Sequence, residues 1–229
     1  MTTSIRGICS MATRALLDEL AAMYSRLTGV PVSFLPVGGV EAVRRVSAGE
    51  PFDVVALASD AIDKLVAAGK VDAAGKVDLA RSGVGVAVHA SAERPDISTG
   101  DALRSAVQGA ASIAYSTGPS GVALMALFER WGIAGEIRSR LVQAPPGVPV
   151  GSLIARGEAA LGFQQMSELI GIERIRLIGP LPPEIQIITI FSAAPGIGSA
   201  QPAAVRALLD FMISADSAES KRRHGMDPA

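Results

Sequence analysis

The residues that most suggest chemistry lie at positions 115–121, where the sequence reads YSTGPSG. The stretch follows an apolar run typical of a buried strand, and apolar residues spaced at i, i+3, i+4 and i+7 follow it, which predicts a helix. Ser116 or Thr117 could cap that helix, and Pro119 suits its first turn. A helix that begins here presents unpaired N–H groups and the positive end of its dipole, which favour an anion. The alternative is an ordinary strand-to-helix turn, because Gly, Pro and Ser are frequent in such turns.

Three further loops share the same order of a strand, small polar residues and the start of a helix. They occupy residues 10–13, 37–40 and 147–151. In open α/β sheets, ligands bind beyond the carboxyl ends of the strands, where such loops gather. Each loop alone could be only a turn, but four of them favour an anion-binding cleft whose donors are backbone N–H groups and hydroxyls.

Several polar side chains are further candidates near these loops. Gln164 and Gln165 end an apolar strand, and we expect one side chain to point into the cleft and the other outward. The alternative is a strand end whose side chains hydrogen-bond a neighbouring loop. The carboxylates of Glu41, Glu168 and Glu184 lie near loop ends, and any of them is conceivable as a general base. Nothing in their spacing marks a catalytic pair, so the sequence assigns no catalytic residue.

Charged and nucleophilic candidates are weaker. Arg14, Arg44 and Arg45 could supply positive charge to a carboxylate ligand, although arginines on helices are more often solvated. The single cysteine, Cys9, borders the first loop and is expected to be a small buried residue rather than a nucleophile.

The composition limits the classes of function. The chain has 229 residues, of which 49% are hydrophobic and 19% charged, so it can fill a sizeable core. The formal net charge is −1 and aromatic residues make up only 4%, which argues against nucleic acid as a partner. One cysteine and two distant histidines exclude an internal disulfide and predict no metal site and no cofactor.

The N-terminal residues and the apolar runs bear on the location. No apolar run approaches the length of about 20 residues that spans a bilayer, so the chain is not expected to be embedded in a membrane. Residues 1–10 lack the pattern of an export signal. The expected location is therefore cytoplasmic if the sequence is complete as given, and periplasmic if a leader was removed.

The pattern predicts alternating strands and helices, hence right-handed crossovers and mixed, mostly parallel sheets with helices on both faces. The expected strands are 5–9, 32–35, 52–57, 84–89, 110–115, 159–164, 176–178 and 185–191. The expected helices include segments that end near residues 28, 48, 68, 107 and 156, one that carries the apolar residues 124–131, and the segments 203–213 and 218–223. Both halves contain the strand–loop–helix pattern, which fits two α/β lobes with a ligand between them.

The order of several motifs resembles that of periplasmic molybdate-binding-like proteins, the type II solute-binding proteins of ABC transporters. The motifs are ICSMAT at 8–13, TGVPV at 28–32, GEPFDV at 49–54, GEAALGF at 157–163 and the closing segment 208–226. The resemblance covers nearly the whole chain. It implies one lobe of residues 1–82 plus 189–229, a second of 83–188, and hinges near 82–84 and 187–190.

The resemblance also implies which residues contact a ligand, because the family clasps an oxyanion between its lobes with serine hydroxyls and helix N-terminal amides. Position by position, these contacts fall on Ser10, Gly39, Ser120, Gly147 or Val148, and Gln165. Neighbouring residues of the same loops complete the expected site, and Tyr115 and Ser116 are the candidates for setting ligand identity. The completing set is Met11, Gly38, Tyr115, Ser116 and Gly121.

Two departures from the family pattern bear on the ligand. Gly38 and Gly39 stand where the family has a serine, and Gln165 stands where it has a tyrosine. The loss of a hydroxyl and the gain of amides predict an organic carboxylate rather than molybdate. The expected function is therefore that of a monomeric anion receptor working with an ABC permease. A bacterial aconitate isomerase is similar to the same fold, so the alternative is an isomerase acting on a tricarboxylate.

Overall fold

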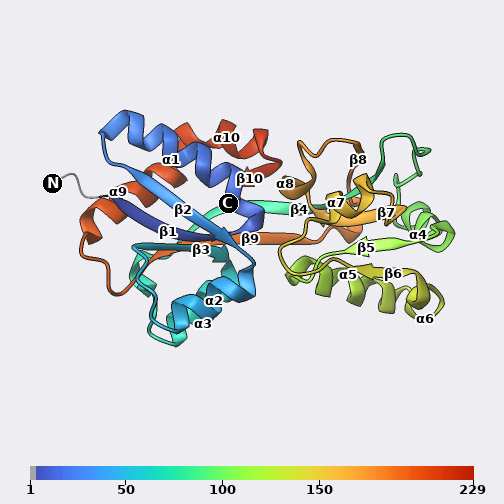
Figure 1. Cartoon of the computed structure of the whole chain (residues 1–229), viewed down its shortest axis with the longest axis horizontal. Coiled ribbons are helices and arrows are strands. Elements are labelled where there is room, and N and C mark those ends of the chain that lie inside the picture. Colours follow the sequence, from blue (N-terminus) through green and yellow to red (C-terminus); the bar gives the residue numbers. More distant parts are fainter. Residues whose placement is uncertain (1–3) are drawn as a thin grey trace. The chain divides into compact units, whose positions relative to one another are not determined.

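The structure is a computed structural model that describes residues 4–229. These residues form two compact units, one of residues 4–82 and 190–229 and the other of residues 83–189. The chain passes between the units within two strands, β4 (Val77–His89) and β9 (Ile188–Pro195). Figure 1 labels the elements of both units along the chain.

The first unit is built on a mixed sheet in the order β2-β1-β3-β9-β4, with β10 paired to β4. Strand β1 is parallel to both β2 and β3, whereas β9 is antiparallel to β3 and β10 is antiparallel to β4. The strands that complete the set are β1 (Ile5–Ser10), β2 (Val32–Val37), β3 (Val54–Ala58) and β10 (Met226–Pro228). The carboxyl ends of β1, β2 and β3 therefore meet at one edge of this sheet.

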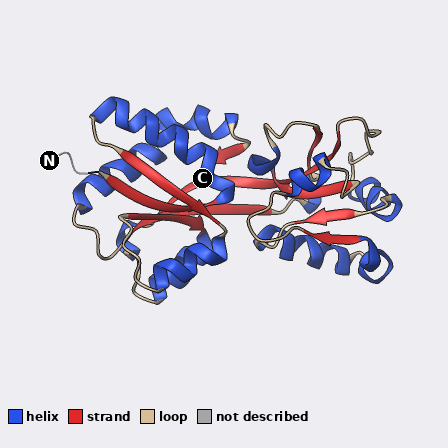
Figure 2. Ribbon diagram, viewed as in Figure 1, coloured by secondary structure: helices blue, strands red, loops and turns tan. Residues whose placement is uncertain are grey.

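Helices cover both faces of that sheet, as Figure 2 shows. Alternation along the central strand β1 explains this, because Ile5 and Cys9 pack in one core cluster and Ile8 in another. The helices are α1 (Arg14–Thr28), α2 (Gly39–Ser47), α3 (Ser59–Ala67), α9 (Pro202–Ile213) and α10 (Ala218–Arg223), with short 3-10 turns at Met11–Thr13, Ala73–Gly75 and Ala215–Ser217. Residues of α1 and α9 belong to the first cluster and residues of α2 and α3 to the second.

The second unit has the strand order β4-β7-β5-β6, with β8 also paired to β4. Strand β5 is parallel to β6 and β7, and β4 is antiparallel to β7 and β8. The strands are β5 (Ile113–Tyr115), β6 (Leu141–Gln143), β7 (Leu161–Gln165) and β8 (Ile175–Pro180). Because β5, β6 and β7 run the same way, their carboxyl ends share one edge of this sheet.

Two layers of helices enclose the second sheet. The longest helix, α5, buries Leu124, Leu127 and Phe128, and the Phe128 ring meets the Phe163 ring of β7 edge to face at 5.9 Å. The helices are α4 (Gly100–Gly109), α5 (Pro119–Arg130), α6 (Ala134–Ile137), α7 (Val150–Ala155) and α8 (Met166–Leu169), with 3-10 turns at Arg138–Arg140 and Pro183–Ile185. Residues of α4, α5 and α6 pack on one face of the sheet and residues of α7 and α8 on the other.

The α/β fold with helices on both sheet faces confirms the expected fold class, but several element bounds differ. Strand β4 begins at Val77 rather than Val84, and the expected strand at 110–115 is shortened to Ile113–Tyr115. Strand β10 was not expected, because its three residues carry no periodic signal and are fixed by pairing with residues 80–82 of β4. The antiparallel pairings of β8, β9 and β10 also make the sheets less parallel than expected.

Candidate functional site

Two loops and the start of a short helix follow the parallel strands at the carboxyl edge of the second unit. The strands β5, β6 and β7 end at Tyr115, Gln143 and Gln165. The loop after β6 is joined to the end of β5, because the backbone N–H of Ala144 donates to the carbonyl of Tyr115 at 2.9 Å. The topology thus brings the predicted residues of this unit to a single edge.

The loop at residues 116–121 leads into α5 with a glycine as its N-cap. Gly118 occupies the N-cap position and Pro119 the first turn, so the expectation that Ser116 or Thr117 caps the helix is wrong. A proline at the first helical position fixes the N-cap one residue before it. The Ser116 hydroxyl instead lies 3.2 Å from that of Ser120, which is buried. The first turn of α5 therefore has no side-chain cap.

The same loop packs tightly against the helix at Gly121. A Cβ atom at this position would lie 1.8 Å from the carbonyl oxygen of Ser116, far inside van der Waals contact. Only glycine lets the chain from Ser116 pass this close to α5. The conformation that exposes the α5 N-terminus thus depends on this residue.

The loop after β6 reaches α7 through a turn at Gly147. This glycine has a φ of 79°, a left-handed conformation that favours glycine, and Val148 donates its N–H to Pro145 at 3.0 Å. The backbone N–H of Val150, the first residue of α7, donates to Oε1 of Gln164 at 2.8 Å. A side chain from β7 therefore caps α7 and holds this loop beside the end of β7.

Both glutamines at the end of β7 are buried, which contradicts the expectation that one points outward. Successive side chains of a strand point to opposite faces, and helices cover both faces of this sheet. Gln165 donates Nε2 to the Thr189 hydroxyl at 2.7 Å, whereas its Oε1 has no partner among residues 4–229. The buried hydroxyl of Ser167 also lacks a partner within the described chain. Two unsatisfied polar atoms thus lie at the start of α8.

Of the three carboxylates considered as a base, Glu168 differs from the others. Its only hydrogen bond within residues 4–229 is from Nε2 of Gln164 at 2.8 Å, and burial raises the pKa of its carboxyl from 4.5 to about 7. Glu41 accepts two hydrogen bonds from Arg44, which lower its pKa. The exposed Glu184 accepts from the N–H of Gly100 at 2.8 Å. Glu168 is therefore the carboxyl whose charge is least compensated.

The carboxyl edge of the first unit carries the loops after β1 and β2. The buried Ser10 hydroxyl lies 3.2 Å from that of Thr13, and Met11 begins the short turn before α1. Gly38 is the N-cap of α2 and Gly39 is its first residue, and a Cβ at either position would meet nothing within 4 Å. The start of α2 therefore has neither a side-chain cap nor a neighbour that fills the space beside it.

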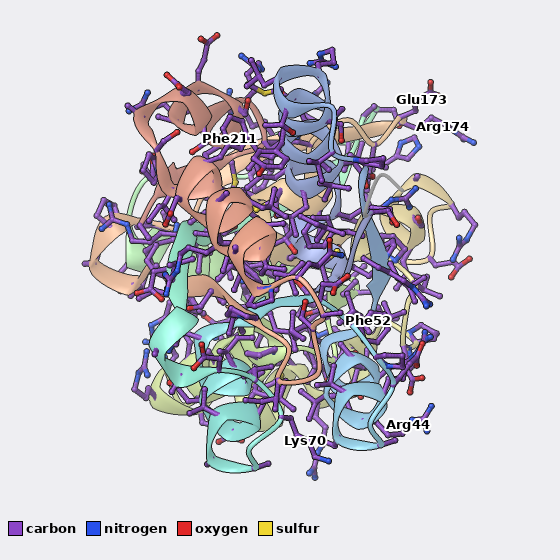
Figure 3. All side chains as sticks on the ribbon, turned by 90° about the vertical axis from the view of Figure 1, so that its left-hand side faces the viewer. Arg44, Phe52, Lys70, Glu173, Arg174 and Phe211 are labelled. Carbon is purple, nitrogen blue, oxygen red and sulfur yellow. The ribbon has the colours of Figure 1, made fainter. Side chains whose placement is uncertain are left out.

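The arginines considered as sources of positive charge for a ligand lie beside acidic residues of their own unit. Arg14 lies 3.7 Å from Asp18, and Arg44 donates to Glu41 through two bonds of 2.7 Å. Arg45 donates to Glu50 at 2.6 and 2.5 Å. Figure 3 shows Arg44 at the outer edge of that view. Each guanidinium pairs with a carboxylate a few residues away, on its own helix or just beyond it.

Cys9 is fully buried, as expected of a small core residue. Loss of hydration raises the pKa of its thiol to about 12, so the thiol stays protonated near neutral pH. Within residues 4–229, no group of three or more His, Cys, Asp or Glu side chains is placed to hold a metal ion. Among the same residues, no helix is long and apolar enough to cross a membrane.

The residues predicted to contact a ligand lie on the strand ends, loops and helix starts at the two carboxyl edges. Those of the first unit are Ser10, Met11, Gly38 and Gly39, and those of the second are Tyr115, Ser116, Ser120, Gly121, Gly147, Val148 and Gln165. That the two edges clasp one ligand, with hinges near 82–84 and 187–190, remains a prediction. The contact of Gln165 with Thr189 and the hydrogen bonds that join Val150, Gln164 and Glu168 were not predicted from the sequence. The spacing of Gln164 and Glu168, four residues apart, was the available signal for the hydrogen bond between them.

Comparison with known proteins gives one family and one close relative. The model of the family described as bacterial extracellular solute-binding protein matches residues 5–227. The chain is 36% identical over 232 aligned positions to a protein named aconitate isomerase from Pseudomonas sp., covering 99% of this chain and 88% of the relative.

The fold is also similar to that of solved structures. The periplasmic molybdate-binding protein of Azotobacter vinelandii has a TM-score of 0.81 at 20% identity and covers 97% of this chain and 98% of its own. The sulfate-binding protein SubI of Mycobacterium tuberculosis has a TM-score of 0.78 at 18% identity, with coverages of 99% and 87%. At these identities, the likeness establishes the fold and leaves the ligand open.

Proposed function

The chain belongs to the bacterial extracellular solute-binding protein family, and from this membership we propose that it binds a small organic carboxylate. The observation that carries the proposal is the carboxyl edge of the second unit, where the uncapped start of α5 lies with the unpaired, buried Oε1 of Gln165. Buried polar atoms are nearly always hydrogen-bonded, because an unsatisfied one costs about 1–3 kcal/mol. A polar ligand at this edge would satisfy them.

The Gln165 amide suits a carboxylate because its two ends can exchange places. The Thr189 hydroxyl, now an acceptor at 2.7 Å, can equally donate, so rotation of the amide turns Nε2 toward the ligand and Oε1 toward Thr189. An N–H donor of this kind favours a carboxylate oxygen. Pro119 has no N–H, and the N–H groups of Gly121 and Val122 donate to the Gly118 carbonyl. The N–H of Ser120, which has no backbone partner within residues 4–229, adds a donor at the positive end of the helix dipole.

The ligand size is argued from the first unit. The open space beside Gly38 and Gly39 leaves room that a serine side chain would occupy. Room and amide donors together favour an organic anion over a compact tetrahedral oxyanion. The relative at 36% identity is named for aconitate, which supports a tricarboxylate as the ligand class. Since the family is described as extracellular and solute-binding, we extend the proposal to action outside the cytoplasm with an ABC permease.

A second candidate function is isomerisation of a tricarboxylate, and Glu168 is the observation that favours it. Movement of an allylic proton needs a base, and the pKa of the Glu168 carboxyl, raised by burial to about 7, suits proton transfer at neutral pH. The name of the relative points the same way. A receptor and an isomerase would share the binding step and differ only in turnover.

Thermal shift against a panel of anions tests the binding proposal. The panel holds cis- and trans-aconitate, citrate, molybdate, tungstate and sulfate. A ligand at about 100 times its Kd stabilises the folded state by about 2.7 kcal/mol, which corresponds to roughly 5–10 °C for a chain of this size. We expect such a shift with a tricarboxylate and none with molybdate.

Two variants complete this test. Gln165→Ala is expected to reduce the shift by more than half, because it removes the amide at the ligand edge. Gln108→Ala, on α4 and bonded to Glu136, serves as the matched control and should leave the shift unchanged. Strong stabilisation by molybdate or tungstate, with none by carboxylates, would contradict the proposal.

A further inference from the structure

We propose that Glu168 is the catalytic residue that takes a proton from the bound tricarboxylate and returns it to a different carbon. The inference rests on the second candidate function, the isomerase, and it names the group that the sequence could not choose among Glu41, Glu168 and Glu184. It also assigns a part to Gln164, which holds the Glu168 carboxyl in place.

The other two candidate carboxylates, Glu41 and Glu184, are already hydrogen-bonded or exposed to solvent. Glu41 forms a two-point pair with Arg44, with both bonds at 2.7 Å, and this guanidinium keeps the carboxylate charged and weakly basic. Glu184 is exposed to solvent and is bonded to the backbone of Gly100. Glu168 has no cation partner within residues 4–229, and its Oε2 accepts no hydrogen bond from the same residues. One oxygen is thus held and the other remains available.

Glu168 also lies close to the residues predicted to contact the ligand in the second unit. It lies in α8, which begins directly after the last residue of β7 at the carboxyl edge where the predicted ligand residues gather. Two buried side-chain atoms without partners within residues 4–229, Oε1 of Gln165 and Oγ of Ser167, belong to residues three and one positions before it. Three polar side chains within four consecutive positions therefore have atoms without partners, which is unusual unless a polar ligand satisfies them.

The Glu168 carboxyl is held in place through the Gln164 amide. Oε1 of Glu168 accepts from Nε2 of Gln164, and Oε1 of Gln164 in turn accepts from the N–H of Val150. Because both ends of the Gln164 amide are committed, its orientation is fixed and so is the held oxygen of Glu168. Gln164 is thus a positioning residue that ties the carboxyl to the start of α7.

Within residues 4–229, the elements that pack against α8 bring no cation to Glu168. The strand β7 and the helix α7, which pack against α8, carry no ionisable side chain, and Arg156 just beyond α7 is paired with Glu158 at 2.5 Å. Glu173 and Arg174, on the loop after α8, are exposed, and Figure 3 shows both at the outer edge of that view. Loss of hydration without a compensating cation raises the pKa of Glu168 to about 7. Near neutral pH, the group can both accept and release a proton.

The chemical step balances without any co-reactant. The Glu168 carboxylate takes one proton from the methylene carbon of the tricarboxylate, and the electron pair of that C–H bond spreads over the three allylic carbons and their carboxylates. The neutral Glu168, whose proton can exchange with solvent in the meantime, then gives one proton to the other end of the allylic system, which shifts the double bond by one position. No electron is lost or gained, and Glu168 returns to its starting state. Donors at the start of α5 would stabilise the negative charge that develops.

The test follows isomerisation of cis-aconitate by proton NMR in H2O and in D2O. We expect the full-length wild-type protein to interconvert cis- and trans-aconitate and to introduce solvent deuterium at the allylic carbons. Glu168→Gln keeps the size of the side chain and an oxygen for Gln164, so it should retain the ligand-induced thermal shift. Its turnover and deuterium incorporation should fall by about 100-fold or more, the range of general acid–base catalysis. Glu173→Gln is the control and should behave as the wild type.

Other outcomes separate this inference from the functions on which it rests. Turnover and deuterium incorporation that persist in Glu168→Gln would overturn the role of Glu168 and leave the isomerase standing. Binding of tricarboxylates by the wild type without turnover or deuterium incorporation would overturn the isomerase and Glu168 together and leave the receptor.

A further measurement needs no variant. The wild-type kcat/KM should rise with pH through about 7, the pKa of the Glu168 carboxyl. A kcat/KM that does not change across this range would contradict proton abstraction by Glu168.

Discussion

Replacing Gly121 by alanine is expected to destabilise the second unit by about 3 kcal/mol, the upper part of the range for overpacking. The added Cβ would lie 1.8 Å from the carbonyl oxygen of Ser116, and a backbone atom cannot move aside as a flexible side chain can. Relief requires the loop at 116–121 to shift away from α5. Trp131, the single tryptophan of the chain, directly follows α5, so its fluorescence during urea unfolding reports on this unit.

Gly109→Ala is the matched control for this variant. Gly109 is the last residue of α4, and a Cβ there meets nothing within 4 Å. Alanine at this site should leave stability unchanged or raise it by up to about 1 kcal/mol, the difference in helix propensity. Equal unfolding midpoints for Gly121→Ala and Gly109→Ala would show that the loop does not pack as described.

The second large effect is a pH-dependent difference in stability between Glu168→Gln and the wild type. Burial raises the pKa of the Glu168 carboxyl from 4.5 to about 7. Between these two pH values, the carboxyl is protonated in the folded protein and ionised in the unfolded chain. In that window, the folded state binds more protons, and wild-type stability must fall as the pH rises. The stability linked to this proton is complete below about pH 4.5 and is lost through about pH 7.

The glutamine variant lacks this titration. We therefore expect the free energy of unfolding of Glu168→Gln, relative to that of the wild type, to rise by about 3 kcal/mol from about pH 4 to about pH 8. This is the free energy that corresponds to the shift of the Glu168 pKa. Urea unfolding at both pH values measures the gain, with the exposed Glu173→Gln as a control that shows none. If the difference in free energy of unfolding between Glu168→Gln and the wild type is the same at both pH values, the Glu168 carboxyl is hydrated or paired and this account is contradicted.

Much of the fold could be predicted because its signals are local. The apolar spacing in α5 and the Pro119 signal placed that helix, and Gly29 ends α1 in a left-handed conformation with a φ of 74°, as its sequence position indicated. The loops of the expected site followed from the alternation of strands and helices. Parallel strands then bring such loops to one edge, whatever their spacing along the chain.

The remaining features depend on contacts between distant residues, which local patterns do not encode. Val150 and Gln164 meet only because β7 runs beside α7, and Gln165 reaches Thr189 at 2.7 Å across 24 positions.

Lys221 lies in a run of three basic residues that resembles a solvated surface, yet the residue is only 2% exposed. It forms no hydrogen bond or ion pair within residues 4–229, and burial lowers the pKa of its ammonium group.

Amide NMR shifts on addition of trans-aconitate test the central claim most directly, because they report the ligand and its place together. In 1H–15N spectra of the full chain, we predict saturable shifts concentrated at residues 116–121, 147–150 and 164–168 of the second unit and at residues 10–13 and 38–41 of the first. Molybdate at the same concentration should leave these amides unchanged. Shifts confined to other residues, or shifts at these residues caused by molybdate alone, would contradict a carboxylate site at these edges.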